Sequence, residues 1–453
     1  MTRLVVIGGN AAGMSAASKA KRRAPELEVE VLEAGPDISY SVCGAPYLVE
    51  GVVPDIEQLR VLSTEDAKKR GITVRTQCRV ISFNAYTKEV VFQGAKGRDS
   101  SHYDKLLIAT GTTPKNPFKG GDLGGVYAVR RLDDAARLVD GTKGAKNVAV
   151  VGGGYLGLEM AAAFKARGAN VHLLTRGKRL LTAMDADITD GLTEWLENAG
   201  ITVHLEAGVK GFSAGKKEGH LGSVEAKKDV AADAAIVAVG VQPATEFAVK
   251  SGVTTTKEGH ILVDDNMHTN YHDVWAAGDC VAARHLITGR PTAMPFALPS
   301  NHMGRVAGDA IGASTEKIPG PCMYFPGVLG TAITHLFGLA FAQTGITQTQ
   351  AKEEGIDAVA ALIESKDKAN YMPGAADMAV KVLAERGSGK LLGVQIACPS
   401  EAALRINAAA VAVQAGMKVH KLAEIETAYA PHFSPVYDPL IVAASECAKL
   451  VKK

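Results

Sequence analysis

The chain has 453 residues, of which 47% are apolar and 22% charged, a composition typical of a folded rather than a disordered protein. At about 150 residues per domain, this length predicts two to four domains. The net charge of only +2 argues against a protein dedicated to binding nucleic acid.

Three further features narrow the class of protein. No apolar stretch approaches the roughly 18 residues of a membrane span and the N-terminus does not read as a signal peptide, so we expect a cytoplasmic protein without a membrane partner. The six cysteines are far apart and form no Cys/His cluster, which predicts neither a metal site nor a disulfide framework. Glycine is enriched, with 48 residues, which favours phosphate-binding turns.

A dinucleotide-binding fingerprint is predicted at the start of the chain. Residues 4–7 are a continuous apolar run, as expected for a parallel strand buried on both faces, and a glycine turn and a helix over 11–23 follow. A second strand, 29–32, ends in Glu33, whose carboxylate can accept hydrogen bonds from a ribose diol. Asn10 replaces the middle glycine of the pattern, so a side chain stands where the backbone should approach a phosphate. The turn consists of Gly8, Gly9, Asn10, Ala11, Ala12 and Gly13.

A second copy of the fingerprint lies in the middle of the chain. The strand 148–151 leads into a complete GxGxxG turn, a helix to about Arg167 and the strand 171–174. Thr175 and Arg176 stand where an NADH site normally has a carboxylate, and a basic residue there suits the 2′-phosphate of NADPH. A solvated basic loop would look the same, so both nucleotides stay open. The glycines of this turn are Gly152, Gly154 and Gly157.

Three later segments are predicted to complete these two folds. Residues 106–114 and 235–243 are similar strand-and-turn segments. Residues 274–279 form an apolar strand that ends in a Gly-Asp pair, and an aspartate placed there, before a helix, can reach the ribityl hydroxyls of a flavin. The turn residues of these segments are Thr110, Gly111, Gly240, Gly278 and Asp279.

In this order, the five motifs make the chain similar to the flavin-dependent pyridine nucleotide–disulfide oxidoreductases. The resemblance implies an α/β fold with two Rossmann-like dinucleotide-binding domains, for FAD and for NADPH or NADH, and an α+β C-terminal domain that forms a homodimer. The expected domains are 1–114 with 246–325 for FAD, 115–245 for NAD(P)H, and 326–453 for dimerisation.

The resemblance also assigns cofactor contacts to residues of this chain. Those expected against FAD are Gly8, Gly9, Asn10, Ala11, Ala12, Gly13, Glu33, Thr110, Gly111, Gly278 and Asp279. Those expected against NAD(P)H are Gly152, Gly154, Tyr155, Gly157, Glu159, Thr175, Arg176 and Gly240. By the same analogy Tyr155 is a gate over the flavin, and Glu159 lies near the nicotinamide.

The cysteine pattern indicates one branch of this family. Leu48 stands five residues after Cys43, so the CxxxxC pair of glutathione-reductase-like members is missing. Residues 39–47 (SYSVCGAPY) instead resemble the SxxxCGxPY segment of the single-cysteine branch, which contains coenzyme A disulfide reductases, persulfide and polysulfide reductases, and NADH oxidases and peroxidases. Ala11 stands where the oxidases and peroxidases typically have a histidine, which argues against them.

Two C-terminal segments resemble coenzyme A disulfide reductases. Residues 370–374 (NYMPG) and 429–439 (YAPHFSPVYDP) are similar to their NYYPG and YAPPFSPVWDP segments. Tyrosines of these segments lie near the cysteine of the partner subunit in that family, which implies catalytic roles for Tyr371 and Tyr429. Interface packing would also explain both tyrosines. His432 stands where the family has proline, and its role stays open.

The same resemblance implies a coenzyme A site. Lys19, Arg22 and Arg23 share one face of the first helix, which is either a solvated face or a site for the phosphates of a polyanionic substrate. Val42 replaces a residue that is asparagine in some members and contacts substrate, so the exact disulfide stays open. The expected substrate contacts are Ser15, Lys19, Arg22, Ser39 and Asn301.

Cys43 is expected to be the redox residue. Its segment reads as the start of a helix, and a helix N-terminus favours the thiolate. Electrons would pass from NAD(P)H through FAD to a disulfide between Cys43 and one half of the substrate. Cys280 has no redox role in this scheme. The cysteines expected to be small buried apolar residues are Cys78, Cys322, Cys398 and Cys447.

The sequence therefore predicts an FAD-dependent NAD(P)H:disulfide oxidoreductase that acts on coenzyme A disulfide or on related small disulfides or persulfides. A persulfide or polysulfide reductase and an NADH oxidase are alternatives built from the same parts. A nucleotide-binding flavoprotein that acts as a redox-sensing interaction module is an alternative from a different class.

Overall fold

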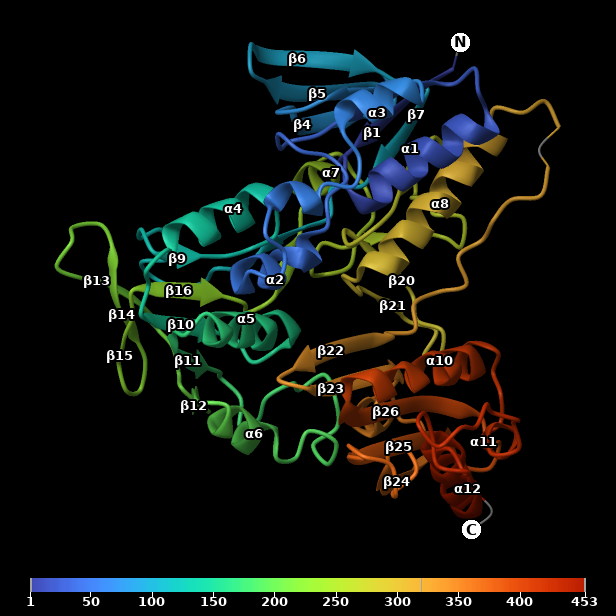
Figure 1. Ribbon diagram of the computed structural model, residues 1–453. Coiled ribbons are helices and arrows are strands. Elements are labelled where there is room, and N and C mark those ends of the chain that lie inside the picture. Colours follow the sequence, from blue (N-terminus) through green and yellow to red (C-terminus); the bar gives the residue numbers. More distant parts are fainter. Residues whose placement is uncertain (1, 319, 452–453) are drawn as a thin grey trace.

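The computed structural model describes residues 2–318 and 320–451, which form three bodies, each built around a five-stranded sheet (Figure 1). The predicted fold class is confirmed: two Rossmann-like units of parallel strands and helices, and a C-terminal unit with an antiparallel sheet. Within the described ranges, no helix combines the length and apolar character needed to cross a lipid bilayer.

The first body contains a parallel sheet with the strand order β19-β7-β1-β2-β3. Its central strands are buried on both faces, which explains why they read as continuous apolar runs. Strand β19 pairs with β7 although the whole second body lies between them in sequence, so two separate stretches of chain build this sheet. The elements are β1 (Arg3–Ile7), α1 (Ala11–Arg23), β2 (Glu28–Leu32), α3 (Thr64–Lys69), β3 (Ile72–Arg75), β7 (Lys105–Ile108), β19 (Val274–Ala276) and α8 (Ala297–Ala313).

Helices α1 and α8 lie against one another beside this sheet (Figure 1). Gly304 and Gly308 of α8 face the backbone of Ala12 and Ala16 of α1, and a Cβ at either glycine would lie 2.3 Å from the alanine's carbonyl oxygen. Any larger residue would force the helices apart. This close contact brings the first turns of both helices to the same cavity, described below.

The second body repeats the parallel arrangement, with the strand order β12-β11-β10-β16-β9. A small antiparallel sheet, β13-β14-β15, packs on its outer side (Figure 1). The elements are β9 (Val126–Tyr127), α4 (Leu132–Gly141), β10 (Asn147–Val151), α5 (Tyr155–Ala166), β11 (Asn170–Leu174), α6 (Leu192–Asn198), β12 (Ile201–His204), β13 (Gly211–Ala214), β14 (Leu221–Glu225), β15 (Val230–Ala231) and β16 (Ala234–Val237).

The third body contains an antiparallel sheet with the order β22-β23-β26-β25-β24, with α10 and α12 packed against its strands. The end of the sheet at β22 packs against α5 of the second body (Figure 1). The elements are β22 (Ala332–Leu336), β23 (Leu339–Gly345), α9 (Gln348–Glu353), β24 (Ala358–Lys366), β25 (Asp377–Glu385), β26 (Leu391–Pro399), the 3₁₀ helix η3 (Ser400–Arg405), α10 (Ile406–Gln414), α11 (Val419–Leu422) and α12 (Pro439–Val451).

Short elements connect the bodies. Helix α2 packs against α4 and α5, and Ala45, Leu48 and Val49 enter the core of the second body. Strands β8 and β17 pair where the chain passes between the first two bodies. Strands β4, β5 and β6 form a separate three-stranded sheet, and β18, β20 and β21 form another. The bounds of the remaining elements are η1 (Val42–Gly44), α2 (Ala45–Glu50), η2 (Ile56–Leu59), β4 (Arg79–Asn84), β5 (Glu89–Gly94), β6 (Gly97–His102), β8 (Thr112–Pro114), β17 (Val241–Pro243), α7 (Glu246–Lys250), β18 (Ile261–Leu262), β20 (Val281–Arg284) and β21 (Pro291–Thr292).

The elements agree closely with the sequence prediction, with one exception. The helix predicted over 11–23 coincides with α1, and the strand 29–32 lies in β2. The helix expected after Asp279 is α8, but it begins only at Ala297, because β20 intervenes and its buried residues pair with β18 and β21. The numerical domain boundaries stay a prediction.

Candidate active site

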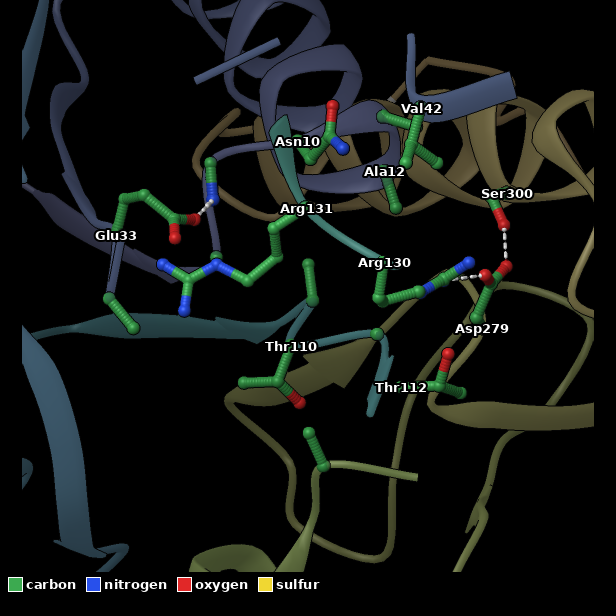
Figure 2. A pocket seen from close by; sticks show the side chains of 18 of the residues that line it. Asn10, Ala12, Glu33, Val42, Thr110, Thr112, Arg130, Arg131, Asp279 and Ser300 are labelled. Carbon is green, nitrogen blue, oxygen red and sulfur yellow. Dashed lines mark hydrogen bonds and ion pairs between the residues drawn. The ribbon is translucent and has the colours of Figure 1, made fainter. Parts of the chain in front are cut away.

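A cavity of about 500 Å³ opens at the carboxyl ends of β1, β2 and β7, where the strand order of a doubly wound sheet places ligand sites (Figure 2). It collects most of the residues predicted to contact FAD. Those that line it are Gly8, Gly9, Asn10, Ala11, Ala12, Glu33, Thr110, Gly111, Gly278 and Asp279.

The glycine turn is shaped by contacts that only glycine allows. Gly8 has φ +106°, and a Cβ there would lie 2.3 Å from the carbonyl oxygen of Ala109. Gly13 does not line the cavity; a Cβ at this position would lie 1.9 Å from the carbonyl oxygen of Gly8, so it serves the close packing of turn and helix. The turn therefore presents its backbone to the cavity, as a phosphate requires.

Asn10 does not obstruct this turn, although the sequence raised that concern. Its side-chain oxygen accepts a hydrogen bond of 3.1 Å from the backbone N–H of Tyr40. The side chain is thus occupied with the 39–47 segment, and it ties that segment to the start of α1.

Glu33 is held in place at the end of β2. Its two carboxylate oxygens accept hydrogen bonds from the backbone N–H groups of Gly9, at 2.7 Å, and Gly35, at 2.6 Å. A carboxylate fixed at this point is in the position from which the fingerprint binds a ribose diol.

Across the cavity from Glu33, polar side chains gather around Asp279 (Figure 2). The sequence predicted only Asp279 among them. Asp279 forms an ion pair with Arg130 and accepts a hydrogen bond of 2.5 Å from Ser300. The buried hydroxyl of Thr112, beside them, has no hydrogen-bond partner among the described residues. Arg130, Arg131, Thr112 and Ser300 were missed. The arginine pair gave a signal, since positive charge just before the start of a helix is unfavourable without a ligand.

These features fit the adenine dinucleotide FAD. The glycine turn suits the pyrophosphate, Glu33 suits a ribose, and Asp279 with the unpaired hydroxyl of Thr112 suits a chain of hydroxyl groups. No group of three or more His, Cys, Asp or Glu side chains in the described part of the chain is arranged to hold a metal ion.

Cys43 lies on η1 and lines the same cavity with an exposed side chain. Its pKa is raised, first by desolvation and then by the negative charge of Glu159, while Arg130 acts in the opposite direction. The sequence predicts that a helix N-terminus favours its thiolate, whereas burial and the negative charge of Glu159 act against that form.

Glu159 and Tyr155 lie on one face of α5 near this cysteine. Burial raises the pKa of Glu159, although a hydrogen bond of 2.9 Å from the hydroxyl of Thr334 lowers it in part. Burial also raises the pKa of Tyr155, whose hydroxyl has no partner among the described side chains and backbone groups. Neither residue lines the cavity, but α2, which follows Cys43 in the chain, packs against the helix that carries both.

The second fingerprint has the same backbone design as the first. Gly152 has φ +126° and Gly157 packs against its carbonyl oxygen, where a Cβ would lie at 1.9 Å. Gly154 and Gly240 have no atom within 4 Å of a Cβ position, so open space surrounds the turn. Of the two residues after β11, Thr175 and Arg176, the threonine is buried and the arginine exposed.

Comparison with known proteins identifies the family. Residues 2–299 match the pyridine nucleotide-disulphide oxidoreductases, and residues 331–440 match the dimerisation domain of the same family. The chain belongs to this family. The FAD and NAD(P)H cofactors expected from the sequence are those of the family, and residues 331–440 are its dimerisation domain.

Several members of the family resemble this chain over nearly its whole length. An NAD(P)H sulfur oxidoreductase (CoA-dependent) of Pyrococcus abyssi is 37% identical over 97% of both chains. A coenzyme A disulfide reductase of Staphylococcus epidermidis is 26% identical over 96% of this chain and 97% of its own. The structure of an NAD-dependent persulfide reductase from A. fulgidus is 33% identical, with a TM-score of 0.94 over 100% of this chain and 84% of that one. Relatives named NADH oxidase match at 32% identity and below.

Within this oxidoreductase fold, the predicted substrate residues fall into two groups. Ser39 and Asn301 line the cavity, and Asn301 accepts a hydrogen bond of 2.7 Å from Ser15, which joins α1 to α8. Ser39 has φ +46°, an uncommon conformation held by three backbone hydrogen bonds of its segment. The other two residues, Lys19 and Arg22, lie further along α1.

The basic face expected on α1 is divided by the fold. Lys19 and Arg23 form ion pairs with the buried Asp309 of α8, at 3.0 and 2.8 Å, and Arg23 also pairs with Glu316. Arg22 is exposed and lines a separate surface hollow. The sequence could not show this, because Asp309 lies 290 residues beyond Lys19 in the chain.

The two predicted catalytic tyrosines lie in the dimerisation domain and do not line the cavity of their own chain. Tyr371 is 70% exposed and Tyr429 48%, and the neighbouring hydroxyl of Tyr371 raises the pKa of Tyr429. Further exposed apolar side chains lie in the same C-terminal segment: Phe433, Val436 and Tyr437.

The environment of the cysteines differs from the prediction at one position. Cys78, Cys398 and Cys447 are buried, as expected, and so is Cys280. Cys322 is exposed, because it lies in the irregular segment between α8 and β22 rather than in a core. Of the two exposed cysteines, Cys43 and Cys322, only Cys43 lines the cavity.

Proposed function

We propose that this oxidoreductase uses NAD(P)H to reduce the S–S bond of coenzyme A disulfide through Cys43. The observation that carries the proposal is that Cys43 is the single exposed cysteine at the cavity that fits FAD. The similarity to relatives named for coenzyme A-dependent sulfur chemistry supports the substrate class.

The chemistry follows from a single reactive sulfur. The thiolate of Cys43 attacks the substrate disulfide, forms a mixed disulfide and releases one coenzyme A thiolate. FAD, when bound, relays the electron pair of NAD(P)H to sulfur. The two electrons and the proton of one hydride then cleave the mixed disulfide into the Cys43 thiolate and a second coenzyme A thiol. The thiolate released first takes a proton from solvent, so one NAD(P)H and one further proton are consumed per disulfide.

We infer that the enzyme is a homodimer in which Tyr371 and Tyr429 serve the cavity of the second copy. Both tyrosines are exposed on a domain that matches the family's dimerisation domain, together with apolar side chains that water would otherwise surround. There they would hold the incoming sulfur or protonate the leaving thiolate.

Reduction of a coenzyme A persulfide or of polysulfide is a second candidate. The relatives whose names suggest it are a coenzyme A polysulfide/persulfide reductase, 36% identical to this chain, and a persulfide reductase, 33% identical, compared with 26% for the coenzyme A disulfide reductase. Reduction of persulfide or polysulfide would use the same cysteine and cofactors.

An NADH oxidase activity is less favoured, because Ala11 places a methyl group where a histidine is typical of the oxidases.

One experiment separates these candidates. Anaerobic turnover with NADPH or NADH is measured on coenzyme A disulfide and on polysulfide for the wild type, Cys43→Ser and Arg22→Ala, with oxygen consumption measured in parallel. Cys43→Ser should abolish reduction of both sulfur substrates but retain FAD. Arg22→Ala should raise KM for coenzyme A disulfide by about tenfold, as expected for a lost charged contact, and leave polysulfide unaffected. Cys322→Ser, at the other exposed cysteine, is the matched control and should behave as wild type.

The proposal fails if Cys43→Ser still reduces disulfides. Equal effects of Arg22→Ala on both substrates would remove coenzyme A from the proposal. Oxygen consumption as fast as disulfide reduction would favour the oxidase.

A further inference from the structure

The two glycine turns share a backbone contact with a later segment of their own unit. In the first turn, the carbonyl oxygen of Gly9 accepts a hydrogen bond of 2.9 Å from the backbone N–H of Ser39, which has φ +46°. In the second, the carbonyl oxygen of Gly153 accepts one of 2.8 Å from the backbone N–H of Leu181, which has φ +47°. Each donor lies seven residues beyond the end of its strand, β2 or β11. The same arrangement is therefore built twice.

The residue before each donor packs against the turn. A Cβ at Gly9 would lie 2.7 Å from Cγ2 of Ile38, and a Cβ at Gly153 would lie 2.8 Å from Cδ2 of Leu180. Both apolar side chains are buried. Each turn thus rests on the segment that follows its second strand, and we call residues 180–185 the support segment of the second turn.

The hydrogen bond from Leu181 fixes the direction of an N–H group in the second turn. In a planar trans peptide, the C=O and the N–H of the next residue point in opposite directions. Because the C=O of Gly153 points to Leu181, the N–H of Gly154 points away from the support segment. No atom lies within 4 Å of a Cβ position at Gly154, and α5 begins at the next residue. A pyrophosphate bound at this helix N-terminus would therefore meet an N–H whose direction Leu181 fixes.

The support segment ends at a residue that the dimerisation domain holds (Figure 1). Gln395 of β26 accepts a hydrogen bond of 2.7 Å from the backbone N–H of Asp185 and donates another of 2.7 Å to its carboxylate. Both residues are buried. Between the two ends, the backbone N–H of Met184 donates a hydrogen bond of 3.0 Å to the carbonyl oxygen of Leu181, which closes a turn. A displacement of Asp185 is therefore passed on to Leu181.

We propose that Gln395 and Asp185 are positioning residues for NAD(P)H, through which the dimerisation domain keeps the second glycine turn in the form that binds a pyrophosphate. The inference concerns the nucleotide of the family, so it does not depend on which sulfur compound the enzyme reduces. Failure of the proposed disulfide chemistry is seen separately, as disulfide reduction that survives Cys43→Ser.

The variant Gln395→Met tests the proposal by equilibrium binding. It removes both hydrogen bonds to Asp185, whereas the carboxylate keeps Lys381 and the backbone N–H groups of Gln348 and Thr349. Calorimetric titration of the FAD-bound enzyme with NADP⁺ and with NAD⁺ should show Kd raised about fivefold for both nucleotides, the effect of one hydrogen bond to the pyrophosphate that is no longer well directed. In steady-state kinetics, KM for NAD(P)H should rise by the same factor and kcat should change little.

A hydride donor without phosphate separates positioning from a general loss of structure. The compound 1-benzyl-1,4-dihydronicotinamide carries the reacting ring but has nothing that the glycine turn could bind. Its rate of flavin reduction, followed by the loss of flavin absorbance under nitrogen, should be the same in Gln395→Met and in the wild type.

Thr344→Val is the matched control, because Thr344 is also buried in this sheet but bonds to Thr331 instead. It should bind both nucleotides as the wild type does. Unchanged Kd values for Gln395→Met would overturn the proposal, and so would equal losses with the nucleotides and with the benzyl compound. Gln395→Asn, whose side chain is too short to reach both atoms of Asp185, replaces the methionine variant if that protein does not accumulate with FAD bound.

Discussion

The exposed guanidinium of Arg176 follows β11, where a dinucleotide fingerprint normally ends in a carboxylate. We expect it to bind the 2′-phosphate of NADPH. Arg176→Ala should raise KM for NADPH by about tenfold, the cost of a charged hydrogen bond at an exposed site, and leave KM for NADH unchanged. Steady-state kinetics with both nucleotides check this.

Lys178→Ala offers a matched control for Arg176, since Lys178 is an exposed basic residue of the same loop. A wild type that prefers NADH, or an arginine variant with unaltered KM for NADPH, would contradict the assignment.

At the scale of single residues, the sequence predicted which side chains gather at the cavity better than it predicted their environment. Cys43 and Glu33 lie where the motifs place them, because a motif specifies backbone geometry within a few residues. The orientation of Asn10 toward Tyr40 and the ion pair of Lys19 with Asp309 depend on segments distant in sequence. The raised pKa of Cys43 comes first from burial and then from the charge of Glu159, more than a hundred residues away.

At the scale of elements, the contact between α1 and α8 invites a direct test. Gly308→Val would place a branched side chain where even a Cβ lies 2.3 Å from the carbonyl oxygen of Ala16. We expect a loss of about 1–3 kcal/mol in the free energy of unfolding and weaker FAD retention, because the helices would separate near the cavity. Thermal unfolding and flavin absorbance after gel filtration measure both effects.

Arg305→Ala, on the exposed side of α8, is the control and should change the unfolding free energy by less than about 0.5 kcal/mol. Full flavin retention in the Gly308 variant would show that the helix contact is not needed for the site.

The elements of the first two bodies were predictable because buried parallel strands and glycine turns leave strong local patterns. The region between Asp279 and α8 was not, since β20 is short and its apolar residues fit a helix as well as a strand. Tertiary pairing with β18 and β21 decided it.

At the scale of the whole molecule, a buried polar network joins the second and third bodies. Asp185 is 4% exposed; Lys381 lies 3.1 Å from its carboxylate, and the amide of Gln395, at 2.7 Å, and the backbone N–H groups of Gln348 and Thr349 donate hydrogen bonds to it. Burial alone would raise the pKa of Asp185, but these hydrogen bonds and the charge of Lys381 outweigh it and lower the pKa below its ordinary value.

The sign of the pH effect follows from that lowered pKa. Asp185 stabilises the fold fully above the pKa of an unfolded aspartate, about 3.9, and the contribution is lost as pH falls through the lower folded value. Asp185→Asn should lose about 3 kcal/mol at pH 7, because the hydrogen bonds to a buried carboxylate would be weakened and the buried Lys381 would keep only the partly exposed Asp187 as a charge partner. The variant should also be less sensitive to acid than the wild type. Thermal unfolding at pH 7 and at about pH 3.5 checks both statements.

Asp187→Asn is the control here, since Asp187 pairs with the same lysine but its side chain is 44% exposed. Its effect should stay below about 1 kcal/mol. Equal losses in the free energy of unfolding for both variants would show that the burial of Asp185 does not increase its contribution to stability.

The pairing of β19 with β7 has a consequence for how the protein is made. Asp279 and Ser300 belong to the far stretch of the first body, so a growing polypeptide that has just finished its second nucleotide fold still lacks one wall of the flavin cavity. We expect the first body to be incomplete while the second body is being synthesised. FAD should therefore bind only after translation has passed residue 300.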